Sequence, residues 1–114
     1  MSTTTPSATI TEIGAWPIDG LAPLEGRILT VQLPPGAAAP VHRHPGAQFV
    51  WVAAGSVTSR LAGDEQPRRF GTGEGWYERP GRVHELFTNV GDEPATVVVF
   101  DLAVAGAPVL VVEP

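Results

Sequence analysis

The sequence contains no cysteine and no lysine, and each absence excludes a class of chemistry. Without cysteine there are no disulfides, no thiolate metal ligands and no cysteine nucleophile. Without lysine there is no side-chain amine to form a Schiff base with a carbonyl substrate or with pyridoxal phosphate. Four serines are present, but none lies in a Gly-x-Ser-x-Gly motif. The sequence therefore does not support a serine hydrolase.

Positive charge and long apolar runs are also scarce. The 7 basic residues, all arginine, are outnumbered by 12 acidic residues, so the net charge is −5, and no segment concentrates positive charge. We therefore expect neither nucleic acid nor an anionic membrane as a partner. No run approaches the roughly 20 apolar residues needed to cross a bilayer, and the first 15 residues lack the features of a secretory signal. These observations predict a cytoplasmic protein.

Turn-forming residues, in contrast, are abundant. The chain has 13 glycines and 12 prolines, and its 114 residues suit one domain. Between the turns lie short segments rich in apolar and β-branched residues, at 27–33, 48–53, 56–61, 67–70, 76–78, 84–88 and 96–104. No window repeats its apolar residues at helical spacing, so we expect less than roughly a tenth of the chain to be helical. The predicted fold class is all-β, a barrel or sandwich of antiparallel strands.

The two ends and the last long segment carry further expectations. Residues 1–8 are polar, and we predict a flexible N-terminal tail there, followed by a single domain over residues 9–114. Residues 95–104, ATVVVFDLAV, are almost continuously apolar, which predicts a strand covered on both faces. The apolar residues 108–112 form either an edge strand or a surface that pairs with a neighbouring subunit.

The three histidines of the chain form the best candidate site. His42 and His44 are two residues apart, so on an extended chain both imidazoles project from the same face. Gln48 follows one Pro-Gly turn and His84 follows another, which allows a barrel to bring both to the same point. Three imidazoles and one oxygen suit Fe, Mn, Ni, Zn or Cu better than Ca or Mg. The predicted cofactor is therefore one divalent transition metal ion.

Three of the surrounding positions leave alternatives open. If the amide oxygen of Gln48 binds the ion, the ion keeps its full charge and is a stronger Lewis acid that is held less tightly. If Gln48 only lines the pocket, the three histidines hold the ion alone and more positions stay open. Tyr77 and Glu78 are candidate catalytic residues for proton transfer at the mouth of the barrel, and the sequence does not decide which one faces inward.

The spacing of these residues resembles the two motifs of the cupin superfamily. The first motif, with glutamine in place of the family's glutamate, is matched by Gly36, His42, His44, Gln48 and Gly55. The second is matched more loosely, by Gly75, Pro80, Gly81 and His84. The resemblance covers residues 24–104, and the stretches HRHPGAQFVWV and GEGWYERPGRVHE look like a common group of small single-domain bacterial cupins. It implies the cupin barrel, which is a double-stranded β-helix or jelly roll.

The resemblance also implies a class of function. Three-histidine iron sites in the family bind substrate at open metal positions and then activate oxygen, so a metal-dependent dioxygenase acting on a small organic molecule is the first expectation. A lyase or an isomerase is also compatible, and the alternative to an enzyme is a barrel that binds or senses a small ligand. We further expect a homodimer, because Phe49 and Trp51 alternate with Gln48 and so point out of the barrel, where a second copy would cover them.

Overall fold

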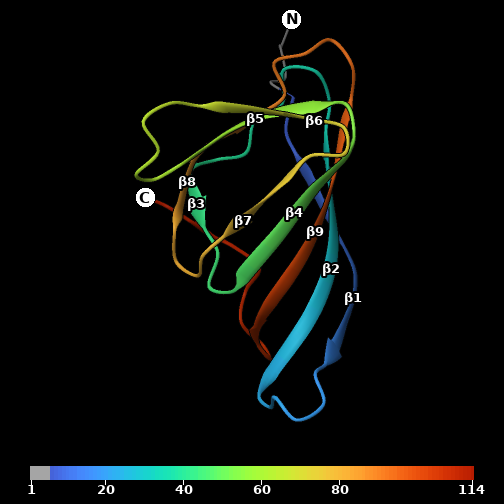
Figure 1. Ribbon diagram of the computed structural model, residues 1–114, viewed down its shortest axis with the longest axis vertical. Coiled ribbons are helices and arrows are strands. Elements are labelled where there is room, and N and C mark those ends of the chain that lie inside the picture. The colour runs from blue at the N-terminus through green and yellow to red at the C-terminus, as the bar shows by residue number, and fades with distance from the viewer. Residues whose placement is uncertain (1–5) are drawn as a thin grey trace, which may run out of the picture.

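The computed structural model describes residues 6–114, and every regular element in this range is a β-strand (Figure 1). The strands are β1 (Thr9–Pro17), β2 (Leu24–Leu33), β3 (His42–Arg43), β4 (Ala47–Ala54), β5 (Ser56–Leu61), β6 (Arg68–Gly71), β7 (Gly75–Glu78), β8 (Val83–Thr88), β9 (Ala95–Val104) and β10 (Val111–Val112). The lack of helix over residues 6–114 agrees with the lack of helical periodicity in the sequence. No helix in this range is long and apolar enough to span a membrane.

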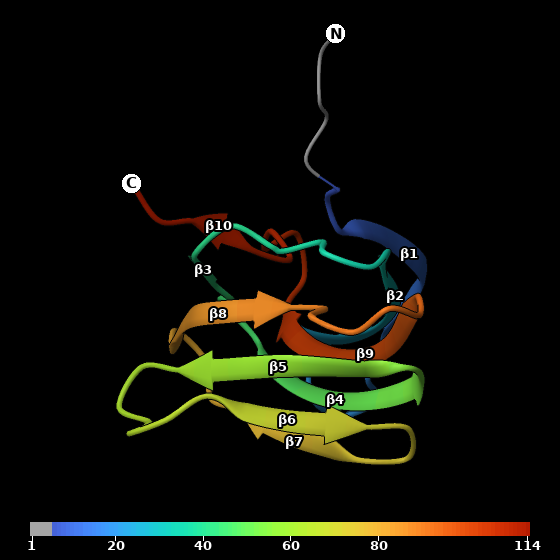
Figure 2. The same cartoon turned by 90° about the horizontal axis from the view of Figure 1, so that it is seen from above.

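The strands form two antiparallel sheets of five strands each. One sheet has the order β1-β2-β9-β4-β7 and the other has the order β10-β3-β8-β5-β6. Sequence neighbours are thus split between the sheets, because the chain crosses from one sheet to the other after β2, β3, β4, β6, β7, β8 and β9. Figure 2 shows the short strands β10 and β3 next to each other beside β8. The predicted all-β barrel of two antiparallel sheets is confirmed.

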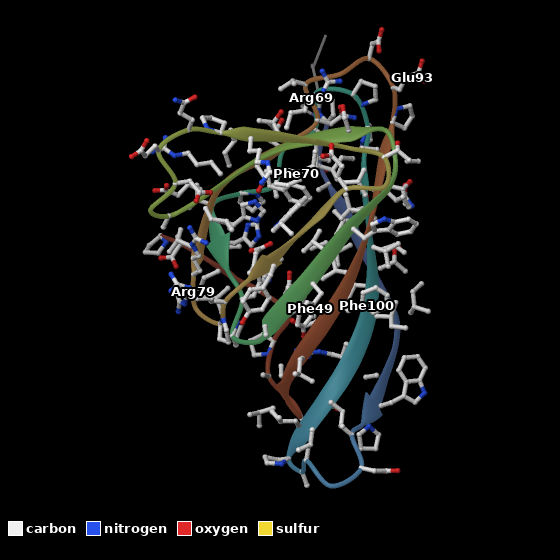
Figure 3. All side chains as sticks on the ribbon, in the orientation of Figure 1. Phe49, Arg69, Phe70, Arg79, Glu93 and Phe100 are labelled. Atoms are coloured by element: carbon white, nitrogen blue, oxygen red, sulfur yellow. The ribbon has the colours of Figure 1, made fainter. Side chains whose placement is uncertain are left out.

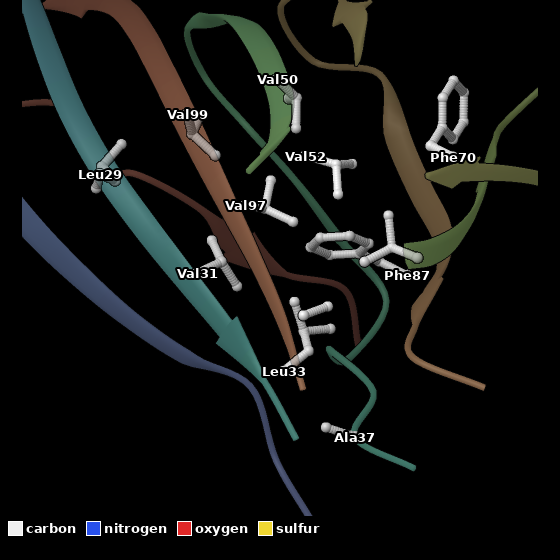
Figure 4. Packing of buried hydrophobic residues seen from close by; sticks show 12 residues of the cluster. Leu29, Val31, Leu33, Ala37, Val50, Val52, Phe70, Phe87, Val97 and Val99 are labelled. Carbon is white, nitrogen blue, oxygen red and sulfur yellow. The ribbon is translucent and has the colours of Figure 1, made fainter. Parts of the chain in front are cut away.

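The core lies between the sheets and is built by strict alternation. In β9, Val97 and Val99 point inward, and in β4, Val50 and Val52 do the same, because successive side chains in a strand point to opposite faces. The opposite sheet contributes aromatic rings to the same cluster (Figure 4). The buried cluster comprises Leu29, Val31, Leu33, Ala37, Val50, Val52, Val57, Phe70, Phe87, Ala95, Val97 and Val99.

The apolar run 95–104 forms β9, but one chain covers only one of its faces. On the outer face Phe100 is 47% exposed, and Phe49 of β4, its partner in the strand register, is 52% exposed (Figure 3). The prediction of burial on both faces is therefore wrong for the single chain. We call Phe49, Trp51, Tyr77 and Phe100 the outer aromatic patch, because these four residues are exposed on the outer face of the sheet.

Both ends of the chain pair with the rest of the domain. β1 was not predicted, because all its residues except Gly14 are exposed and it pairs only with β2, so it carries no pattern of half-burial. Residues 1–5 of the predicted tail lie outside the described residues, while Ser7 bridges Ala38 and Ala8 packs against the core, so contact with the domain begins before residue 9. At the other end, β10 pairs with β3, which makes residues 111–112 an edge strand of their own chain.

The close approach of β7 to β4 yields a test of the fold. A Cβ at Gly75 would lie 2.2 Å from the carbonyl oxygen of Val50, so Gly75→Ala forces the strands to shift. We expect it to lower the free energy of unfolding by about 1–3 kcal/mol, the usual range for overpacking, in urea denaturation. Gly26→Ala is the matched control, because its Cβ would meet nothing closer than Ile18 Cδ1 at 3.9 Å. Equal losses in both variants would show that steric contact at Gly75 is not the cause.

Candidate metal centre

The candidate site lies between the two sheets, and both sheets contribute to it. His42 in β3 and His84 in β8 are direct partners in the strand register, and His44 follows β3. Gln48 in β4 and Glu78 in β7 are direct partners in the other sheet. All five side chains are buried, with 2–7% of each residue exposed. One nitrogen from each histidine lies within 4.8 Å of the others, so the three could hold a metal ion.

Backbone carbonyls determine which nitrogen of His42 and His44 carries a proton. Nδ1 of His42 lies 2.6 Å from the Pro40 oxygen, and Nδ1 of His44 lies 2.9 Å from the Val109 oxygen. Because a carbonyl only accepts hydrogen bonds, Nδ1 must donate in both rings. Burial lowers the pKa of both histidines, so both are neutral at pH 7 and Nε2 carries a lone pair. The two Nε2 atoms are 3.1 Å apart, an arrangement of two acceptors that a cation would stabilise.

His84 presents a third bare nitrogen. Its Nε2 lies 2.7 Å from Ser59 Oγ, while its Nδ1 is buried without a hydrogen-bond partner, 3.5 Å from Glu78 Oε1. Burial, followed by the neighbouring His42 and His44, lowers the pKa of His84 to about 3. This ring is therefore neutral at pH 7, and the tautomer that donates from Nε2 to Ser59 has a lone pair on Nδ1, on the side of Glu78.

Of the two candidate catalytic residues, only Glu78 faces inward. Its Oε2 accepts a hydrogen bond of 2.9 Å from Trp76 Nε1, and its Oε1 has no hydrogen-bond partner and lies 3.6 Å from His44 Nε2. Burial raises the pKa of Glu78 to about 7. Tyr77 is 48% exposed and packs on Phe49 in the outer aromatic patch, with ring centroids 5.2 Å apart. The structure thus places Tyr77 away from the histidines.

Gln48 points inward as predicted, and a buried ion pair orients its amide. Nε2 of Gln48 donates to Asp101 Oδ1 over 3.0 Å, and Arg27 Nε donates to Asp101 Oδ2 over 2.8 Å. Arg27 is held in turn by the Ala107 carbonyl at 2.6 Å. Because the amide nitrogen is committed to Asp101, the amide oxygen is the atom of Gln48 left for the cavity that the residue lines.

Sequence reasoning missed the residues that support the site. Asp101 and Arg27 had a local signal, since each is a charged residue at an inward position of an otherwise apolar strand, and they are register partners across β2 and β9. Ser59 had none, because it meets His84 from 25 positions away. Trp76 had a local one, because it lies two residues before Glu78 in β7 and so on the same face of that strand.

The cavity at the site is small and mostly apolar. Its volume is about 80 Å³, well below the roughly 300–1,000 Å³ of pockets for drug-sized ligands. The histidines, Gln48 and Glu78 line it together with apolar side chains that include Val31, Val50 and Phe87. A larger open depression of about 460 Å³ lies by Arg69 and Glu93, residues labelled in Figure 3, and contains none of the histidines.

The donor atoms have the spacing of a metal's ligand shell. Bonds of about 2.1 Å place neighbouring ligand atoms about 3.0 Å apart in an octahedral shell and about 3.4 Å apart in a tetrahedral one. The separations here are 3.1 Å between the two Nε2 atoms of His42 and His44, and 3.5 and 3.6 Å from Glu78 Oε1 to His84 and His44. These three separations are close to ligand-shell edges, the three histidine nitrogens lie within 4.8 Å of one another, and the donor types suit a transition metal ion.

Comparison with known proteins agrees with this fold. A family model of the cupin domain matches residues 29–101, which is more than half of the chain and includes all five residues of the site. The chain belongs to the cupin family. A search of curated proteins found no match.

Solved structures with the same fold include proteins with different chemistries. A double-stranded β-helix protein from Klebsiella pneumoniae subsp. pneumoniae MGH 78578 is 21% identical, with a TM-score of 0.71, and the match covers 100% of this chain and 90% of that one. An oxalate oxidase in complex with the substrate analogue glycolate is 23% identical, with a TM-score of 0.72 and coverage of 91% and 54%. The DMSP lyase DddQ from Ruegeria pomeroyi DSS-3 is 24% identical, with a TM-score of 0.67 and coverage of 76% and 42%. The chain thus spans about half or less of these two enzymes, and the likeness shows the fold alone.

The lowered histidine pKa values predict how acid affects the metal-free protein. Below pH 6.5 the histidines of the unfolded chain bind protons that the same histidines do not bind in the folded protein. The free energy of unfolding should therefore decrease as the pH is lowered. The loss is at most about 1.4 kcal/mol per pH unit for each histidine that stays neutral. Urea denaturation of chelator-treated protein on either side of pH 6.5 measures it.

Glu78 acts in the opposite direction and provides the control. Its pKa is raised from 4.5 to about 7, so over this range the folded protein keeps a proton that the unfolded chain has lost. The contribution of Glu78 to the free energy of unfolding therefore increases as the pH falls from 7 to 4.5. Glu78→Gln removes it and should make the acid loss steeper. Stability that rises on acidification below pH 6.5 would contradict the neutral, buried histidines.

Proposed function

We propose that this cupin is a metal-dependent enzyme that acts on a small organic molecule. His42, His44 and His84 hold one divalent transition metal ion, Fe, Mn, Ni, Zn or Cu, and the amide oxygen of Gln48 is a further donor. The observation that carries the proposal is that three buried imidazoles each bring a ring nitrogen within 4.8 Å of the others. When bound, the metal supplies Lewis acidity and open positions for the oxygen atoms of a substrate.

The protein's own part is to orient and to exclude water. The Pro40 and Val109 carbonyls hold His42 and His44 in the tautomer with bare Nε2, and Asp101 directs the amide of Gln48. The apolar walls of the cavity keep bulk water from the metal, which strengthens every charge interaction there.

The size of the cavity supports a small substrate and an enzyme of the dioxygenase class. About 80 Å³ accepts only a molecule, or a part of one, with few non-hydrogen atoms. Two enzymes of this fold, the oxalate oxidase and the DMSP lyase, are named for small substrates. An oxidoreductase such as a dioxygenase is therefore our first assignment, and a lyase or an isomerase is the second.

One observation favours a second candidate, a non-catalytic barrel that binds or senses a small ligand. Apart from Glu78, no side chain lining the cavity transfers protons near neutral pH without also being a proposed metal ligand. A site with few groups for proton transfer suits oxygen activation or ligand binding better than acid–base chemistry.

Metal content and turnover test the proposal together. Protein purified without added metal, or reloaded after chelation, should contain about one metal per chain by elemental analysis, and His84→Ala should lose it. Tyr77→Phe, on the outer face of the same sheet, should keep both metal and turnover. Iron with oxygen uptake in the presence of small diketones, thiols or phenols supports the dioxygenase. Zinc or nickel without oxygen uptake supports the lyase, the isomerase or the binding barrel, and a wild type that binds no metal refutes the site.

We also propose that the outer aromatic patch is the interface of a homodimer. Phe49 and Phe100 are adjacent on neighbouring strands and about half exposed, and a second copy of this face would cover them. Light scattering at micromolar concentration should give about twice 12.0 kDa, and Phe100→Glu should give the monomer. Val90→Glu, at an exposed residue outside the patch, is the control and should stay dimeric. A monomeric wild type contradicts the proposal.

A cytoplasmic location and the absence of nucleic-acid partners stay predictions from the sequence.

A further inference from the structure

Position 48 holds a neutral glutamine, and a carboxylate lies directly across from it. Gln48 and Glu78 are register partners on β4 and β7, and both side chains are 2% exposed and point into the same cavity. Side chains at such paired positions start from Cβ atoms about 4.5–5.5 Å apart. A carboxylate on β7 can therefore reach nearly the same point as a carboxylate on β4.

The carboxylate of Glu78 is held by one oxygen and free at the other. Trp76 Nε1 donates to Oε2 over 2.9 Å, which fixes the group, whereas Oε1 is buried with no hydrogen-bond partner. Within residues 6–114 the only groups at ion-pair distance from it are the rings of His44 and His84, at 3.6 and 3.5 Å. A buried carboxylate without a partner is costly, so a cation in the space that Oε1 faces would stabilise the charged form of Glu78.

We propose that Glu78 is a metal ligand, with Oε1 binding the ion beside His42, His44 and His84. The inference rests on the proposed metal site and refines it, because it assigns the negative charge of the ligand shell to β7. The distances from Oε1 to His84 Nδ1 and His44 Nε2 are 3.5 and 3.6 Å. They are close to the distance of about 3.4 Å between neighbouring ligand atoms in a tetrahedral shell. This role replaces that of a free proton-transfer group.

The buried ion pair explains why position 48 is neutral. Asp101 Oδ1 lies 3.0 Å from Gln48 Nε2, so a glutamate at 48 would set two carboxylates against each other. Arg27 already neutralises Asp101 and has no second charge to offer. With the amide at 48 donating to Asp101, Glu78 is the one negative charge that faces the metal.

Glu78→Gln is a sharp test because Trp76 decides how the new amide lies. Trp76 Nε1 needs an acceptor, so the amide oxygen takes the place of Oε2 and the NH₂ group faces the site, where it cannot bind a metal. Titration of metal-free protein with Co²⁺, followed by visible absorption, and with Zn²⁺, followed by calorimetry, gives affinities independent of turnover. We expect a loss of more than about 100-fold, beyond the 10–100-fold typical of residues that only orient a ligand. We also expect a changed Co²⁺ spectrum.

Three variants separate the possible outcomes. Gln48→Ala should lose less affinity than Glu78→Gln, and Tyr77→Phe should match the wild type. Glu78→Asp keeps the charge on a shorter side chain and should bind more tightly than Glu78→Gln, which provides a second reading if the glutamine variant folds poorly. Wild-type affinity or an unchanged Co²⁺ spectrum in Glu78→Gln, or a larger loss in Gln48→Ala, overturns the inference while the three-histidine site stands. If the wild type binds neither metal, the proposed function itself fails.

Discussion

The structure depends on how the barrel accommodates five polar side chains between two apolar sheets. Each has one atom anchored to a partner: His42 and His44 to backbone carbonyls, His84 to Ser59, Glu78 to Trp76 and Gln48 to Asp101. The anchors of His42 and His44 use the single N–H donor of each neutral ring, and the anchor of Gln48 uses one of the two donors of its amide nitrogen. Nε2 of His42, Nε2 of His44 and Oε1 of Glu78 remain as acceptor atoms at the centre, an arrangement that a cation would stabilise.

The charges around the site follow the same logic. Arg27 and Asp101 form a neutral pair behind Gln48, and the histidines are uncharged at pH 7, so Glu78 is the one group directed at the centre that can carry a negative charge. A dication in the proposed site would leave a net charge of +1 in the ligand shell, with lower Lewis acidity than a shell of neutral donors alone. The same ion pair that orients the amide thus also keeps position 48 neutral.

The fold positions these groups without defining their chemistry. Structures of the same architecture, 21–24% identical to this chain, include an oxidase and a lyase, so the barrel is a scaffold for several reactions. This chain combines a cavity of about 80 Å³ that has few proton-transfer groups with a carboxylate, Glu78, directly across the strand pair from Gln48. Rigid strands, rather than loops, carry His42, Gln48, Glu78 and His84, which suits a site with fixed spacing.

The sequence alone determined whatever depends on consecutive residues. Alternation in β4 placed Gln48 inward and Phe49 outward, and the His-x-His spacing put two imidazoles on one face, because a strand repeats every two residues. Only the tertiary structure decided that Glu78 rather than Tyr77 faces the histidines, that Arg27 supports Asp101 from 74 positions away, and that exposed β1 is a strand at all. These outcomes depend on the register between strands, which is set by packing among residues far apart in the chain and leaves no local pattern in any one segment.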